Sequence, residues 1–171
     1  MDLYNRYVHI ITFTCASIFG FTLSAHAETA TDSFDVSITI TSTCSIDAAT
    51  DGDIAFGNQL SSVTNIQLST ASIDVVCTLG TPYTLALNNG LNADATSRRM
   101  IGQTVNTEFV PYELYSDAFT TLWGDGTLLG ALKLGLIGTG LTQSHTIFAQ
   151  VPSTNASAQD YSDTVTATIT W

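Results

Sequence analysis

The feature that most constrains the fold is the strict alternation of apolar and polar residues in two segments. In an extended strand, successive side chains point to opposite faces, so each segment presents one apolar face and one polar face. The apolar members of the first segment are Phe34, Val36, Ile38 and Ile40. Those of the second are Val165, Ala167, Ile169 and Trp171.

A strand that carries bulky apolar groups invites pairing with another chain if its face and edge stay open. Two such strands near the ends of one sequence therefore either cap each other or serve assembly. The sequence leaves both alternatives open at this point.

Between these segments, further short runs read as strands because they are rich in β-branched and aromatic residues and are separated by Asp-Gly and Asn-Gly turn signals. No stretch keeps a helical period over three turns. We therefore expect an all-β chain and, from the regular strand spacing, an immunoglobulin-like sandwich of two antiparallel sheets. The expected strands are residues 72–79, 83–88, 109–116, 127–134, 145–151 and 163–171.

The first residues predict export. Arg6 precedes a largely apolar run, and the small-x-small triplet ends at Ala27, as in a secretory signal peptide of residues 1–27. A retained membrane anchor is a weak alternative, because polar residues interrupt the run. Export leaves Cys44 and Cys77 as a pair in an oxidising compartment, and we expect a disulfide rather than two buried thiols.

The composition argues against several classes of protein. The whole chain has a net charge of -11, and so does the chain without its predicted leader, which makes nucleic acid an implausible partner. Residues 28–171 have the size of one domain.

The sequence predicts no catalytic, metal or cofactor site. His145 is the one imidazole that follows the leader, and we expect it to be a plain strand-edge residue. Asp51, Asp53 and Asp125 lack calcium-loop spacing and read as turn residues. Residues 135–140 have the wrong glycine order for a phosphate loop. Trp123 could stack on a carbohydrate, but we favour a structural role near the adjoining turn.

Four stretches carry a resemblance to a known family. They are residues 43–46 (TCSI), 91–100 (LNADATSRRM), 112–127 (YELYSDAFTTLWGDGT) and 161–171 (YSDTVTATITW). In this order they resemble the spore coat protein U domain family, which includes the pilins of archaic chaperone-usher fibres. Phe119 and Thr120 depart from the family pattern, where small or basic residues are expected.

The resemblance implies an incomplete immunoglobulin-like sandwich whose hydrophobic groove is completed by a donor strand from a neighbouring subunit. It implies that residues 28–41 are the donor segment and residues 42–171 the pilin domain. It also assigns the two alternating segments. Phe34, Val36, Ile38 and Ile40 would insert into the neighbour, and the acceptor edge would be formed by Val165, Ala167, Ile169 and Trp171.

The partners implied by the resemblance are identical or related pilin subunits, a periplasmic chaperone and an outer-membrane usher. The chaperone is expected to fill the groove first and to hold the carboxylate of Trp171. The leading hypothesis is thus a non-enzymatic subunit, without cofactor, that is exported to the periplasm and built into a cell-surface fimbrium for adhesion or biofilm formation. The alternative is a surface-coat or extracellular binding module whose N-terminal strand pairs within its own chain.

Overall fold

The structure is a computed structural model that describes residues 26–48 and 53–171. The chain divides into two units, Met1–Ile38 and Thr39–Trp171, which are described separately. Most of the predicted leader lies outside the described residues. Residues 26–38 form neither helix nor strand. Among the described residues, no helix has the length and apolar character needed to cross a bilayer.

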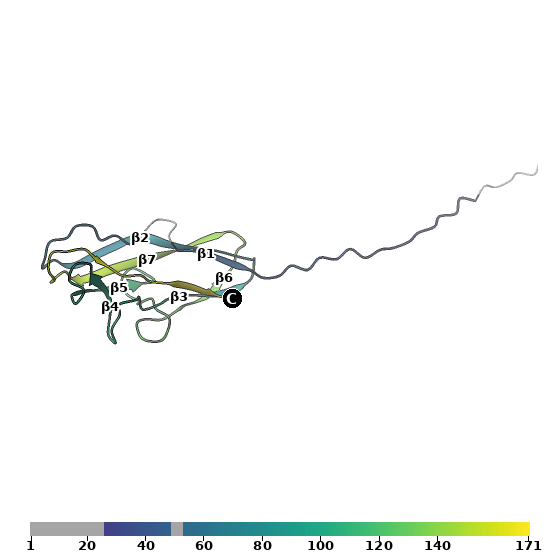
Figure 1. Cartoon of the computed structure of the whole chain (residues 1–171). Helices are drawn as coiled ribbons and strands as arrows, with labels where there is room; N and C mark the ends of the chain where they lie inside the picture. The colour runs from purple at the N-terminus through teal and green to yellow at the C-terminus, as the bar shows by residue number, and fades with distance from the viewer. Residues whose placement is uncertain (1–25, 49–52) are drawn as a thin grey trace, which may run out of the picture. The chain divides into compact units, whose positions relative to one another are not determined.

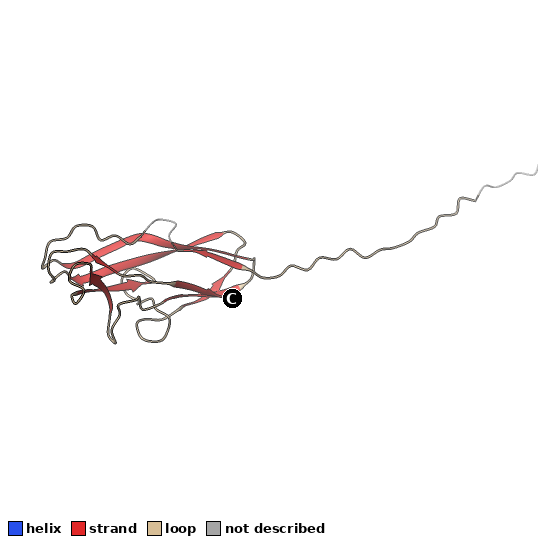
Figure 2. Cartoon of the chain, viewed as in Figure 1, coloured by secondary structure: helices blue, strands red, loops and turns tan. Residues whose placement is uncertain are grey.

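The second unit is built from β-strands joined by loops, as Figure 2 shows. The all-β fold predicted from the periodicity is therefore confirmed. The strands are β1 (Cys44–Asp47), β2 (Thr64–Cys77), β3 (Pro82–Leu87), β4 (Arg98–Gly102), β5 (Phe109–Tyr115), β6 (Lys133–Ile137), β7 (Thr142–Ser153), β8 (Tyr161–Ser162) and β9 (Ala167–Thr170).

The strands form two sheets, in the orders β1-β2-β7-β5-β4-β8 and β6-β3-β9. Every pair of neighbouring strands is antiparallel, and the long strands β2 and β7 run side by side at the centre of the larger sheet (Figure 1). Alternate residues of both sheets face a shared core. The chain is the expected immunoglobulin-like sandwich. Its core includes Ile73, Val75, Tyr83, Leu85, Leu87, Leu114, Trp123, Ile147, Ala149 and Val151.

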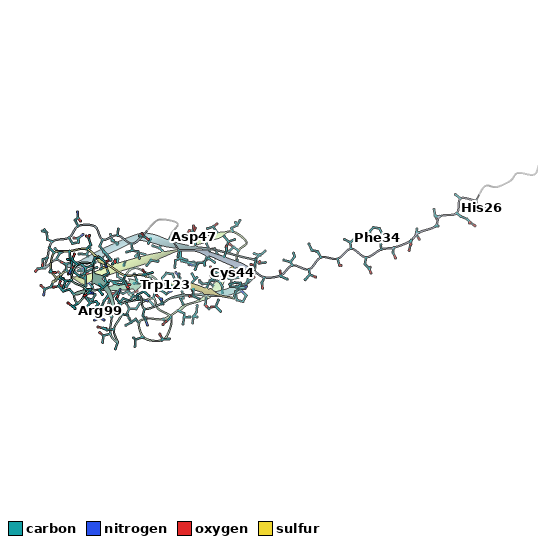
Figure 3. The ribbon with its side chains drawn as sticks, in the orientation of Figure 1. His26, Phe34, Cys44, Asp47, Arg99 and Trp123 are labelled. Atoms are coloured by element: carbon teal, nitrogen blue, oxygen red, sulfur yellow. A yellow bond between two sulfur atoms is a disulfide. The ribbon has the colours of Figure 1, made fainter. Side chains whose placement is uncertain are left out.

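Trp123 is fully buried at the centre of this core (Figure 3). Its indole Nε1 donates a hydrogen bond to the carbonyl oxygen of Leu85, 3.2 Å away. This buried donor is satisfied by β3, so the large ring can fill the space between the sheets. The tryptophan has the structural role favoured by the sequence, since a buried ring cannot stack on a carbohydrate.

The predicted disulfide is present. Cys44 and Cys77 are bonded and lie opposite each other in the register of β1 and β2. Their sequence separation is 33 residues. Because Cys77 is fully buried, the bridge fixes the start of β1 to the end of a core strand.

Some of the predicted strands were wrong in position or extent. Residues 34–40 form no strand in this single chain, because alternation supplies an apolar face but not a hydrogen-bonding partner. Of the strand expected at 127–134, only the last residues belong to β6. Gly126 and Gly130 have positive φ angles, and Asp125 accepts hydrogen bonds from Thr127, so this stretch begins as a turn. Strands β1, β4 and the two-residue β8 were missed.

The expectation of a strand-edge histidine was also wrong. His145 is buried, faces inward from β7, and lies 2.9 Å from the hydroxyl of Tyr83 on the other sheet. A histidine that alternates with inward-facing apolar residues belongs to the core side of a strand, and the pattern around Ile147 and Ala149 carried that signal.

Candidate functional site

The segment from Tyr161 to Trp171 crosses from one sheet to the other. At its start, β8 pairs with β4, where Ser162 lies opposite Ile101. Further on, β9 pairs with β3, where Ile169 lies opposite Leu85. Among the described residues, no strand pairs with the other edge of this segment. The segment therefore offers an unused row of backbone hydrogen-bonding groups.

Residues 53–61 face this segment across the two hollows described below, and β1 lies nearby without lining either one. Strand β1 pairs on one side with β2 and is the edge of the larger sheet. Residues 53–61 are described as irregular chain, although Ile54 and Phe56 are partly buried against the core. β1 and β9 lie near each other but are not hydrogen-bonded neighbours. One strand position between the two sheets is thus unfilled in the described part of the chain.

Two adjoining hollows mark this position, and together we call them the groove. The first has a volume of about 460 Å³ and lies between residues 53–56 and 161–167. The second has a volume of about 620 Å³ and lies between residues 54–61 and 151–161. Both are lined by Ile54, Phe56, Met100 and Tyr161, so they are continuous. The floor of the first is formed by the core residues Ala71, Ile73, Leu87, Leu114 and Ile147.

The floor residues are buried, but other apolar side chains of the first hollow are only partly buried: Ile54, Phe56, Met100, Val165 and Ala167. Partly exposed apolar surface of this kind on a soluble domain marks a binding site. The combination of an apolar floor and an unpaired backbone edge fits an extended segment with alternating apolar side chains, because the backbone can pair while alternate side chains fill the hollows.

Asp163 fixes the segment from Tyr161 to Trp171 near its start. Its Oδ2 accepts a hydrogen bond from the Tyr112 hydroxyl at 2.6 Å. Its Oδ1 accepts from the backbone nitrogens of Leu91 (3.0 Å) and Asn92 (3.2 Å) and from Asn92 Nδ2 (2.8 Å). Burial, and then the bond to Asp163, raise the pKa of the Tyr112 hydroxyl, so Tyr112 remains a donor.

Gly90 makes room for this carboxylate. A Cβ at this position would lie 2.0 Å from Asp163 Oδ2, and the glycine has a φ angle of +82°. Both observations require glycine here. The loop at residues 88–92 is therefore shaped around the carboxylate of Asp163.

Asn88 and Arg98 add further bonds to the frame of the groove, by which we mean the loop at residues 88–92 and the side chains bonded to it. The backbone nitrogen of Asn88 donates to the carbonyl of Thr166 at 3.0 Å, and Asn88 Oδ1 accepts from the nitrogen of Thr166 at 2.9 Å. The buried guanidinium of Arg98 donates to the carbonyls of Leu87, Asn88 and Trp123. Burial lowers the pKa of Arg98. These bonds hold the loop that in turn holds the segment.

The start of the segment has its own anchor. The Tyr161 hydroxyl donates to Glu108 Oε2 at 2.9 Å, and Ser157 and Gln159 donate to the same carboxylate. The hydrogen bond from Ser157, followed by that from Tyr161, lowers the pKa of Glu108. The segment from Tyr161 to Trp171 is thus held by hydrogen bonds at Tyr161, Asp163 and Thr166, and its residues 161–165 and Ala167 line the first hollow.

The predicted acceptor residues are placed differently from one another. Val165 and Ala167 line the first hollow. Ile169 packs partly buried against the core, beyond the hollow. Trp171 is 55% exposed at the end of the segment. Sequence reasoning did not single out Asp163, Tyr112 or Asn88, although the first two lie in the words that carried the resemblance.

The predicted donor residues are all highly exposed. The exposed fractions of Phe34, Val36, Ile38 and Ile40 lie between 77% and 88%, and Figure 3 labels Phe34 on this stretch of chain. In their own chain these side chains have no buried environment.

The remaining candidates for chemistry are structural. Arg99 forms an ion pair with Asp94 at 3.2 Å, and its guanidinium lies 4.2 Å from the ring centre of Phe109. Asp125 accepts from Thr127 within a turn. Asp51 lies outside the described residues. Residues 26–48 and 53–171 contain no cluster of three or more His, Cys, Asp and Glu side chains that could hold a metal ion.

The chain is similar to a protein of known structure. A chain of the CsuC-CsuE chaperone-tip adhesion subunit pre-assembly complex, from archaic chaperone-usher Csu pili of Acinetobacter baumannii, matches with a TM-score of 0.55 and 26% sequence identity. The match covers 78% of this chain and 40% of that chain. The comparison with curated proteins found no match.

The family comparison covers most of the sequence. The model of the Spore Coat Protein U domain matches residues 30–168. This range includes the exposed alternating residues, both walls of the groove and the anchors at Tyr161 and Asp163. Family and fold are those of structural pilus subunits rather than of enzymes. The chain belongs to the Spore Coat Protein U domain family.

Proposed function

We propose that this chain is a structural subunit of a chaperone-usher pilus, assembled by donor-strand exchange, that supports adhesion or biofilm formation. The observation that carries the proposal is the open groove, with core residues as its floor, beside the segment from Tyr161 to Trp171. The same chain also holds the exposed alternating residues that such a groove would accept.

The energetics favour insertion of this segment into a second copy. Burying four large apolar side chains is worth on the order of 6 to 12 kcal/mol before the cost of ordering the segment. The unpaired edge of β9 supplies backbone partners along the inserted strand. Residues 28–41 are the donor segment in this proposal, residues 42–171 are the pilin domain, and residues 1–27 are the cleaved leader.

The partners follow from the same groove. A periplasmic chaperone would fill the groove before assembly, which keeps the apolar floor from aggregating. An outer-membrane usher would then bring in the donor segment of an identical or related subunit. The pre-assembly complex of a chaperone with a Csu pilus subunit supports this order. The subunit would pass through the periplasm to the cell surface and would carry out no catalysis.

The alternative of a self-contained binding module requires residues 34–40 to pair within their own chain. These residues form no strand in the structure, and their apolar side chains are exposed. The alternative therefore has no observation in its favour.

The test moves residues 28–41 behind Trp171 through a short turn-forming linker. All strand pairs in the two sheets are antiparallel, so the added strand can run back along β9 as the second arm of a hairpin. We expect a monomer that is more stable than the parent and no longer polymerises. Thermal unfolding and light scattering measure the two properties.

The matched control carries Ile38→Asp within the transplanted segment. It has the same length and linker but cannot fill an apolar hollow, so it should lose the added stability. If the transplanted wild-type segment gives no more stability than this control, the donor-strand proposal is wrong.

A further inference from the structure

A cluster of exposed apolar side chains lies away from the groove, on the unit Thr39–Trp171. The exposed fraction is 77% for Leu79, 73% for Leu141 and 51% for Ile137. None of these residues lines either hollow. We call these three residues the end patch. Single exposed leucines are common on proteins, so the patch gains meaning only from what holds it and what lies beside it.

The two loops that carry the patch are bonded to each other. Gly80 donates to the carbonyl of Gly138 at 2.8 Å, and Gly138 donates to that of Thr81 at 2.8 Å. Gly140 donates to the carbonyl of Cys77 at 3.0 Å, and a Cβ on Gly140 would lie 3.9 Å from the Cβ of Leu79. The patch is therefore a fixed surface beside the disulfide.

The donor segment is attached beside this patch. The nitrogen of Thr43 donates to the Thr78 hydroxyl at 3.1 Å, and the nitrogen of Thr78 donates to the carbonyl of Thr43 at 2.9 Å. Thr78 is next to Leu79. Three residue steps separate Thr43 from Ile40, the last predicted donor residue, and an extended chain spans about 10 Å in that number of steps.

This short connection restricts where the neighbouring copy can lie. If Ile40 occupies the groove of a second copy, the end of that groove lies within about 10 Å of Thr43. The end patch is beside Thr43, so it faces the second copy at close range. The inference rests on the proposed function at this step.

The direction of the strands identifies which end of the second copy is near. A donor strand that pairs antiparallel with β9, like the other pairs of both sheets, ends beside Tyr161. Two exposed apolar residues lie at that end. Leu60, 80% exposed, lines the second hollow. Val105 is exposed too, and its nitrogen donates to Gln159 Oε1 at 2.7 Å.

We propose that the end patch of one subunit packs on the surface around Leu60 and Val105 of the next copy, as a second contact beside the inserted strand. The contact is head-to-tail, so it repeats along an open filament. Its effect is mechanical. Residues 41 and 42, between Ile40 and the bonded Thr43, would alone form a hinge, and an apolar contact across it favours one angle between subunits and stiffens the fibre.

The test is disulfide trapping in fibres formed by the full chain expressed with a chaperone and an usher. A chain that carries both Leu79→Cys and Leu60→Cys should give a covalent ladder on a non-reducing denaturing gel after boiling. The control pair carries Leu134→Cys with Leu60→Cys, because Leu134 on β6 is 67% exposed but lies outside the end patch. We expect at least a fivefold weaker ladder from the control.

Fibres that form normally but give equal ladders from both pairs would overturn the end-patch contact and leave donor-strand exchange intact. Failure of the parent chain to form any fibre would overturn the proposed function, and the contact with it. A second measurement uses Leu79→Asp with Leu141→Asp against Leu134→Asp with Leu128→Asp, whose leucines are also exposed but lie outside the end patch. The first double variant should form fibres with a shorter persistence length in electron micrographs, and unchanged stiffness contradicts the proposal.

Discussion

Two regions of this chain have nearly the same sequence pattern and opposite structures. Residues 34–40 and 163–171 both alternate large apolar side chains with small polar ones. The second region contains β9, paired with β3 and partly buried against the core. The first is exposed and forms no strand. The pattern specifies a face that can be buried, whereas a strand also requires a partner for its backbone.

The difference lies in the surroundings of each region. Asp163 and Thr166 are bonded to the loop at residues 88–92, which is itself held by Arg98. On the N-terminal side, the first residues with such bonds to the sandwich are Thr43, which is hydrogen-bonded to Thr78, and Cys44, which forms the disulfide. An alternating segment of this protein therefore forms a strand only where a neighbouring element offers a backbone edge to pair with.

Removal of the disulfide tests where the exposed region ends. Replacing Cys44 and Cys77 with serine releases a loop whose ends are 33 residues apart, and the chain-entropy estimate gives a loss of roughly 3 to 4 kcal/mol in unfolding free energy. We also expect faster hydrogen exchange at residues 44–47, because β1 would be held by β2 alone. Chemical denaturation and exchange mass spectrometry measure these changes. Unchanged protection at β1 would show that pairing alone sets the boundary.

An isoleucine-to-aspartate substitution in each region compares their contributions to the stability of the single chain most directly. Ile169→Asp puts a charge against the core and should lower the unfolding free energy of the single chain by about 2 to 3 kcal/mol. Ile38→Asp should change it by less than about 0.5 kcal/mol, because that side chain is already in water. In an assembly assay, Ile38→Asp should nevertheless abolish fibres. Equal destabilisation by both variants would contradict the comparison.

Much of this could be predicted from the sequence, and the misses have physical reasons. Strand-like composition between turn signals predicted strands where β3, β5 and β7 lie. Alternation predicted the inward row that includes Ala167 and Ile169 of β9, because core burial imposes a period of two. It could not place β1, whose four residues are too few for a pattern, or β4, whose Arg98 is buried by bonds to distant carbonyls. The predicted strand at 127–134 failed because Gly126 and Gly130 turn the chain.

The groove was predicted only in part, because it depends on long-range contacts. Alternation placed Val165 and Ala167 on one apolar face, and the family resemblance implied that this face borders a groove. The roles of Asp163, Gly90 and Tyr112 could not be predicted in this way. Asp163 and Tyr112, for example, are hydrogen-bonded partners that lie 51 residues apart along the chain. Within the alternating row, an aspartate at an inward position was the available signal, because a buried carboxylate requires donors nearby.

Aspartate substitutions give a finer comparison of the two regions. Asp163→Ala removes the acceptor of Tyr112, Leu91 and Asn92, and leaves the buried Tyr112 hydroxyl without this partner. We expect a loss of about 1 to 2 kcal/mol in unfolding free energy. Asp35→Ala, in the exposed segment, is the matched control and should be neutral. Thermal or urea unfolding of both variants measures the difference, and a neutral Asp163→Ala would remove this residue from the frame of the groove.

The smallest expected effect is a dependence of the unfolding free energy on pH, which arises from His145 in the sandwich and not from the exposed N-terminal segment. Burial, and then the charge of Lys133, lower the pKa of His145 below its ordinary value near 6.5, while Asp74 acts in the opposite direction. The Tyr83 hydroxyl is its hydrogen-bonding partner.

Because the folded pKa of His145 is depressed, the unfolded chain takes up a proton first as the pH falls. The stability from neutral His145 is therefore fully present above pH 6.5 and is lost as the pH falls from there toward the lower folded pKa. Between pH 7.5 and 5.5 we expect a loss below about 1 kcal/mol in urea unfolding. His145→Asn should abolish this slope, while deletion of residues 28–41 should preserve it, because the exposed segment contributes no histidine. A slope that disappears with the segment but survives in His145→Asn would mean that the pH sensitivity comes from the N-terminal region rather than from the core.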